Sequence, residues 1–337
     1  MQKSYLVFVF CICATIITKA QSVTYKDVEP IFFQKCVACH RSGDAAPFSL
    51  TNYNDVVKRL SFIKEVLEKN YMPPWKADVH YRDFANNRML SEEQKNTILK
   101  WIENKAPKGN YKEKEQEQRN ALLATTAVGR KPDLTFKIDS PFVVKGDNTE
   151  RFIIFKIPFE FEDIHNVEAI EFYCNNKKII HHINYGFYEV QDPNIDIRGG
   201  RSYLNATEDD RSAPDPFILL NRKMTYYTGW IPGTSYENYP KDFGWVLPKR
   251  GVLLLTTHYS ATAVDESSVV GVNIFFRKEP VKREVKVISF GSGGVGENDI
   301  YPKLLLYPGK ISTHHLRVKT SGDQSLLAVS ASHAFSW

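Results

Sequence analysis

The stretch QKCVACHRSG, residues 34–43, has the spacing of a reactive site. Cys36 and Cys39 are separated by two residues, and His40 follows at once. Two thiols so placed can bond the two vinyl groups of a haem, and the imidazole beside them can ligate its iron, which is the order of a c-type attachment site. A zinc half-site and a redox dithiol share the CxxC spacing. Zinc would need two more ligands, for which this region offers only His80, and a thioredoxin-like dithiol would need a βαβ pattern that the sequence lacks.

An electron-transfer haem needs a second axial ligand, and NYMPPWKAD supplies Met72 with Pro73 and Pro74 stiffening the loop behind it. A core-filling methionine is the alternative interpretation. With CVACH and MPPW as the matching motifs, residues 21–108 resemble a class I cytochrome c domain. The resemblance implies a haem c that has His40 and Met72 as axial ligands and carries one electron.

Four histidine clusters lie in or beside strand-like runs of the second half: His181 with His182, His258, His314 with His315, and His333. Neighbouring side chains on a regular strand point to opposite faces, so an adjacent pair can share one metal only if the strand is distorted or different ring nitrogens are used. A hydrogen-bonded histidine on a sheet face is the alternative for each cluster.

The stretches FEDIHNVEAIEFYCNNKKIIHHINYGFYEV and TGWIPGTSYENYPKDFGWVLPKRGVLLLTTHYSAT resemble the copper type II, ascorbate-dependent monooxygenase family. Its members include peptidylglycine hydroxylating and dopamine β-monooxygenases and bacterial homologues, and the likeness covers roughly residues 131–280. It implies that His181, His182 and His258 hold one copper in the first of two jelly-roll sandwich domains. Three imidazoles suit copper in both oxidation states and leave positions open.

The family's second copper, where oxygen binds and the substrate C–H bond is attacked, is held by an HxH motif and a later methionine. In LLAVSASHAFSW, His333 can be the first histidine, but Phe335 holds the place of the second. Alignment on STHHLR keeps only His314 or His315, and no methionine follows Met224. The sequence therefore predicts an incomplete second copper site.

The predicted secondary structure around these residues changes from helices to strands beyond about residue 109. Before it, DVEPIFFQKC, VVKRLSFIKEVLEKN and SEEQKNTILKWIENK have helical spacing, and Ser91 with Gln94 predicts a capping box. From Pro132 onward, runs such as FIIFKI, KKIIHHINYGFY, VLLLTTHYS and VVGVNIFF alternate or are β-branched, with turn residues between them. We expect three short helices around CVACH, followed by a β-sandwich.

The predicted fold is multidomain: a small all-α cytochrome c domain followed by an all-β jelly-roll sandwich with a partial second sandwich. Its boundaries are a signal peptide over 1–20, the cytochrome c domain over 21–108, a charged linker over 109–130, the copper monooxygenase-like sandwich over 131–280 and the partial second sandwich over 281–337. The last segment is about a third of the usual domain size, so its strands either pack onto the first sandwich or belong to a shortened domain.

The opening MQKSYLVFVFCICATIITKAQS is typical of a secretory signal, with an uncleaved anchor as the alternative. Its apolar run is too short to span a bilayer, so we expect a periplasmic or secreted protein that starts near Gln21 and has no membrane span after cleavage. Cleavage lowers the net charge from +5 to +3, because Lys3 and Lys19 are lost, which argues against a nucleic-acid partner. It leaves Cys36, Cys39 and Cys174, too few for a disulfide scaffold.

These features predict a haem c and copper redox protein that hydroxylates a small-molecule substrate with oxygen if its second copper site is completed. Its electron donor or acceptor would be ascorbate or a redox protein. One alternative is a non-catalytic electron-transfer or copper-binding protein with one haem and one copper. Another is a cytochrome fused to a sandwich that binds a partner and no metal.

Overall fold

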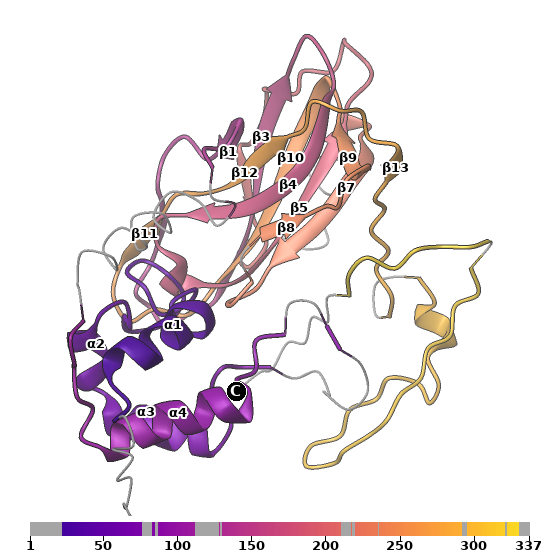
Figure 1. The fold of residues 1–337 in the computed structure, drawn as a ribbon. Helices are drawn as coiled ribbons and strands as arrows, with labels where there is room; N and C mark the ends of the chain where they lie inside the picture. Colours follow the sequence, from indigo (N-terminus) through magenta and orange to yellow (C-terminus); the bar gives the residue numbers. More distant parts are fainter. Residues whose placement is uncertain are drawn as a thin grey trace, which may run out of the picture.

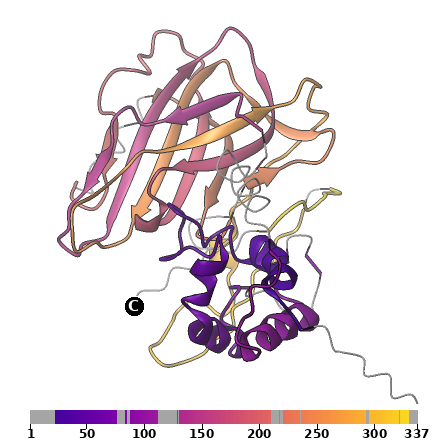
Figure 2. The same ribbon diagram turned by 60° about the vertical axis from the view of Figure 1, so that its left-hand side comes forward.

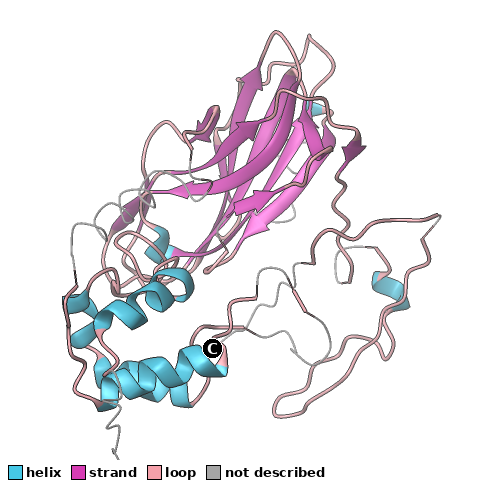
Figure 3. Ribbon diagram, in the orientation of Figure 1, coloured by secondary structure: helices cyan, strands magenta, loops and turns pink. Residues whose placement is uncertain are grey.

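The computed structural model describes residues 22–75, 83–84, 87–111, 128, 130–209, 217, 220–234, 236–291, 295–320 and 322–329. Over these residues the chain is mostly β-sheet with few helices (Figure 3). The helices come first and gather at one end of a β-sandwich, in both views of the ribbon (Figures 1 and 2). The predicted signal peptide, most of the predicted linker and residues 330–337 lie outside the described part.

The described N-terminal part contains four α-helices where three were expected: α1 (Tyr25–Lys35), α2 (Tyr53–Val57), α3 (Leu60–Glu68) and α4 (Glu92–Glu103). The capping box of α4 is confirmed. The Gln94 amide donates to Ser91 Oγ over 3.1 Å, and the Ser91 amide donates to Gln94 Oε1 over 3.0 Å. None of the described helices has the length and apolar character needed to cross a membrane.

The second predicted helix is divided, because the backbone leaves the helical region at Arg59, where φ is −132°. A single helix with Val56, Leu60, Ile63 and Leu67 on one stripe was therefore wrong in its continuity. Three of these residues are buried all the same, while Leu60 packs at the edge of the same core. The apolar spacing indicated which side chains face inward but not where the chain turns.

The helical core is built around Trp101 of α4, which is fully buried. Phe32 of α1 meets its ring edge-on at 6.3 Å between centroids, and Tyr25 lies 5.8 Å from it. The indole nitrogen of Trp101 donates to the Pro107 carbonyl over 3.0 Å. These contacts pack α1 against α4 and fix the end of α1, from which CVACH continues.

His181, His182 and His258 belong to a five-stranded antiparallel sheet. The order of its strands is β6-β3-β10-β5-β7. Its strands are β3 (Arg151–Glu160), β5 (Ile180–Glu189), β6 (Tyr203–Asn205), β7 (Lys223–Trp230) and β10 (Arg250–Tyr259). The short 3-10 helix η1 (Lys177–Ile179) leads into β5. The predicted runs FIIFKI, KKIIHHINYGFY and VLLLTTHYS thus form three adjacent strands.

The facing sheet has the order β1-β12-β4-β9-β13, with β8 also paired to β4. Its strands are β1 (Leu134–Lys137), β4 (His165–Cys174), β8 (Tyr236–Asn238), β9 (Phe243–Leu247), β12 (Val270–Phe276) and β13 (Arg283–Glu284). A separate pair joins β2 (Phe142–Val144) to β11 (Glu266–Ser268). Alternate residues of both large sheets, such as Ile170, Phe187 and Leu255, share one core between them, so the predicted β-sandwich is present.

The predicted partial second sandwich over 281–337 is not found in the described part of that segment. Only β13 joins a sheet, pairing in parallel with β9 of the first sandwich. Beyond it the described residues contain the 3-10 helix η3 (Glu297–Asp299) and two isolated bridges. Leu304, Leu305 and Leu306 are exposed, since no second sheet packs on them. The resemblance to a family with two sandwiches predicted strands here, but strands need a hydrogen-bonding neighbour, and the described residues of this segment pair only at β13 and at the two bridges.

Candidate functional site

A β-bulge in β5 turns two neighbouring histidines to the same face of the five-stranded sheet. His182 is paired with His258 of β10, whereas the next β10 residue, Tyr259, is paired with Ile180. His181 is therefore the extra residue of the bulge. Ile180 and Ile183, on either side of the pair, both belong to the core between the sheets. The distortion that two adjacent histidines need in order to share a metal is present.

His258 is on the same outer face, because the residues on either side of it, Thr257 and Tyr259, are fully buried. Its own side chain is 8% exposed, and its ring stacks on Phe152 of β3 at 3.9 Å between centroids. His181 and His182 are half-buried. We call His181, His182 and His258 the three-histidine site.

The three imidazoles converge through their Nδ1 atoms. His182 Nδ1 lies 3.1 Å from His181 Nδ1 and 3.3 Å from His258 Nδ1. Two nitrogens bound tetrahedrally at about 2.0 Å from one ion are separated by about 3.3 Å. Two of the separations thus match a metal site, and one ligand atom from each of the three residues lies within 4.8 Å of the others. Among the described residues this is the only cluster of three or more His, Cys, Asp or Glu side chains that could hold an ion.

Glu150 determines which nitrogen of His258 is available for a metal. Its Oε2 lies 3.1 Å from His258 Nε2. A carboxylate only accepts hydrogen bonds, so Nε2 carries the proton and Nδ1 of the neutral ring keeps its lone pair. That lone pair faces the other two histidines, as in the carboxylate–histidine–metal arrangement of many metal sites.

The surroundings favour the neutral imidazole, which is the form that binds a metal. Burial lowers the pKa of His182, and the neighbouring His258 and His181 lower it further. Burial also lowers the pKa of His258, against the opposite effect of its hydrogen bond to Glu150. Both rings therefore stay uncharged to a lower pH than an exposed histidine.

Replacing Glu150 by alanine is expected to weaken metal binding at the three-histidine site by about 10- to 100-fold, because His258 loses the partner that fixes its tautomer. Glutamine at this position should cost less, since its Oε1 can still accept from Nε2. A competition titration with Zn²⁺ measures both effects. Glu162→Ala removes an exposed carboxylate two residues beyond the other end of β3 and should leave the affinity unchanged; equal losses in the two alanine variants would contradict this role of Glu150.

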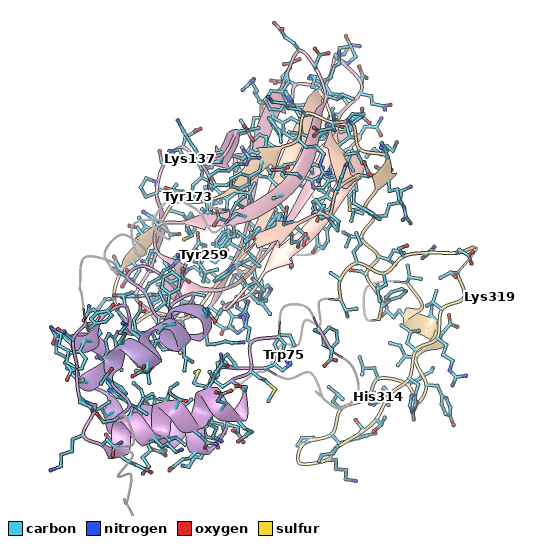
Figure 4. All side chains as sticks on the ribbon, in the orientation of Figure 1. Trp75, Lys137, Tyr173, Tyr259, His314 and Lys319 are labelled. Atoms are coloured by element: carbon cyan, nitrogen blue, oxygen red, sulfur yellow. The ribbon has the colours of Figure 1, made fainter. Side chains whose placement is uncertain are left out.

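The other predicted ligands do not join this site in the described part of the chain. Figure 4 places His314 on the C-terminal segment, away from Tyr259 at the end of β10. Its Nδ1 lies 2.8 Å from the Pro302 carbonyl oxygen and its Nε2 lies 2.8 Å from Ser312 Oγ. His315 is exposed and pairs through its backbone with Tyr301. His333 lies outside the described residues.

The cysteines and histidine of CVACH are gathered on one turn at the end of α1. The amides of Cys39 and His40 both donate to the Cys36 carbonyl, over 3.1 and 2.9 Å. All three described cysteines of the chain are free thiols. The Phe48 carbonyl lies 3.0 Å from His40 Nδ1 and can only accept, so Nδ1 carries the proton and Nε2 is left with the lone pair that an iron requires. These residues therefore fit a haem c.

The two thiols do not have the character of a redox dithiol. Burial raises the pKa of Cys36 to about 12, with a smaller contribution from Cys39. Burial raises the pKa of Cys39 as well. Reactive dithiols instead have a depressed thiol pKa. A zinc site is no better supported, because no metal-ligating cluster of the described residues includes CVACH, and His80 lies outside them.

Met72 follows α3 in a short turn, where its amide lies 3.3 Å from the Val66 carbonyl oxygen. Its side chain is 41% exposed, and the ring of Trp75 beyond the two prolines contacts Phe84. The predicted role of Met72 as the second axial ligand stays a prediction.

Sequence reasoning did not identify Glu150, which meets His258 across 108 residues of chain. The only local signal is its position directly before the first residue of β3, which is the strand that pairs with β10. In comparisons with known proteins, no family model matches this chain and no curated protein is similar to it.

Proposed function

We propose that this chain is a secreted haem c and copper redox protein, in which CVACH holds the haem and the three-histidine site holds the copper. The observation that carries the proposal is the convergence of three Nδ1 atoms at the bulge of β5. Copper is favoured over other metals by the all-imidazole donor set and by the resemblance to the copper monooxygenases.

The helical unit supports a class I cytochrome c domain over residues 21–108. Its first and last helices pack together through Phe32 and Trp101, and the attachment motif directly follows the first of them. Cys36 and Cys39 would form the thioether bonds, and His40 and Met72 would be the axial ligands. The carbonyl of Phe48 holds the His40 ring in the orientation that leaves Nε2 free.

The sandwich over residues 131–280 supports the proposed jelly-roll domain of the copper monooxygenase family. Two adjacent strands, β5 and β10, present the His181–His182 pair and His258 on one face. Glu150 keeps the proton of His258 on Nε2, away from the metal position. When bound, the haem iron and the copper would each supply a one-electron couple. The chain's own residues bind them, keep the imidazoles neutral and fix their tautomers.

Within the family, hydroxylation needs a second copper, and the described residues contain one metal-ligating cluster. This observation favours the alternative version of the proposal, an electron-transfer or copper-binding protein with one haem and one copper. Ascorbate or a redox protein would then be its electron donor or acceptor. A small-molecule substrate belongs to the catalytic version alone.

The copper-to-iron ratio tests the proposal. Mature protein is made in a periplasm with c-type maturation, supplied with copper, dialysed and examined by elemental analysis. We expect about one copper per iron, because each site holds one ion. A ratio near two would instead support the catalytic version. A ratio near zero would contradict the copper site and leave a cytochrome joined to a sandwich that binds no metal.

A further inference from the structure

The loop that follows CVACH contacts the sandwich through an ion pair. Lys177 Nζ of η1 lies 3.3 Å from Asp44 Oδ2, and the two side chains are only 13% and 8% exposed. The Lys177 amide also donates to the Gly43 carbonyl over 3.3 Å. Asp44 is held in place from its own side by Arg41, whose guanidinium lies 2.9 Å from the same oxygen. A charge pair removed from water in this way is strongly unfavourable to break by loss of one partner.

Neighbouring residues extend this interface. Ala45 packs against the core between the two sheets, although it belongs to the helical half of the chain. On the other side, Gly233 in the turn that follows β7 lies near Arg88 and Cys39: a methyl group added there would stand 2.5 Å from Arg88 Nη1 and 3.6 Å from Cys39 Sγ. Lys177 Nζ also lies 5.8 Å from the centre of the Trp230 ring.

The interface is at the metal-binding end of the sandwich. Lys177 begins η1, which runs directly into the strand that holds His181 and His182. Trp230, at the end of β7, is paired with Ile183, the residue after His182. Figures 1 and 2 show the helices at this end of the sheets.

We propose that Lys177 and Asp44 anchor a docking interface that holds the haem-attachment loop against the three-histidine end of the sandwich and couples the two sites. The partner that docks on the metal-binding end of the sandwich is thus the helical half of the same chain. This inference rests on the proposed function for the identity of the two sites. Because coupling is reciprocal, the oxidation state of the haem changes the affinity of the three histidines for a metal.

The docking contact is tested on full-length protein with haem attached. Lys177→Glu places like charges together and should raise the radius of gyration in small-angle X-ray scattering, because the two halves separate. Lys178→Glu is the matched control, since Lys178 is the next residue of η1 and is exposed. Lys177→Arg keeps a positive charge beside Asp44 and should keep the compact radius. Equal radii for Lys177→Glu and Lys178→Glu would overturn the docking contact.

The coupling is tested with Zn²⁺, which does not change oxidation state. Its dissociation constant should differ between the ferric and ferrous forms by about fivefold or more, and this ratio should fall to one in Lys177→Glu. The ratio should persist in Lys178→Glu and in Lys177→Arg. A ratio of one in the unmodified protein would overturn the coupling. A protein that takes up haem but no Zn²⁺ would contradict the proposed copper site and the coupling with it, while the scattering result would still decide the docking contact.

Discussion

Replacing His258 by alanine is expected to reduce the copper content from about one per chain to near zero while haem content stays unchanged. The substitution removes one of three ligands together with the hydrogen bond that His258 Nε2 donates to Glu150. Loss of a supporting residue alone typically costs 10- to 100-fold in metal affinity, so we expect loss of a ligand to cost more than about 100-fold. Elemental analysis after dialysis measures the stoichiometry, and a competition titration measures the affinity.

His165→Ala is the matched control for this experiment. The His165 ring stacks on Phe276 of the facing sheet at 4.4 Å, as the His258 ring stacks on Phe152, but it belongs to no metal-ligating cluster of the described residues. Both variants lose a stacked imidazole from a strand, and only one loses a ligand. Copper retained in His258→Ala, or lost equally in both variants, would contradict the assignment.

Replacing His40 by alanine is expected to abolish stable haem incorporation. The Nε2 atom of this ring is the proposed iron ligand, and the ring lies on the same turn as both cysteines. Met72→Ala should behave differently: the haem remains covalently attached, but the absorption band of the sulfur–iron bond disappears. Haem staining of a denaturing gel measures the attachment, and the visible spectrum of the oxidised protein measures the ligation.

His314→Ala serves as the control, since this residue hydrogen-bonds only within the C-terminal segment among the described contacts. It should keep both the covalent haem and the band. A full complement of haem in His40→Ala would rule this residue out as the ligand. A band that survives in Met72→Ala would rule Met72 out in the same way.

Much of the fold was predictable because the sequence signals are local. The capping box of α4 lies within four residues, and the strand-forming runs around His182 and His258 are visible without any partner. The break between α2 and α3 was missed because the apolar spacing continues across Arg59. The C-terminal segment was predicted to form strands from the family resemblance, but strand pairing depends on a neighbour elsewhere in the chain.

The ligands of the candidate site could be predicted from the sequence, but the residues that hold the site in place could not. The family resemblance gave His181, His182 and His258, while strand geometry alone argued against the adjacent pair. Two supporting contacts join residues more than a hundred positions apart, Glu150 with His258 and Asp44 with Lys177. No local pattern connects such residues, so neither contact could be derived from the sequence.

The bulge of β5 also affects how related chains should be recognised. Ile180 and Ile183 both face the core, with two outward residues between them where a regular strand allows one or three. Deleting one residue of the pair would restore regular alternation and keep the sheet, yet the site would lose a ligand. A histidine pair enclosed by two inward-facing apolar residues is therefore a more selective search pattern than the pair alone, and a homologue with a regular spacing there should not be assigned a metal.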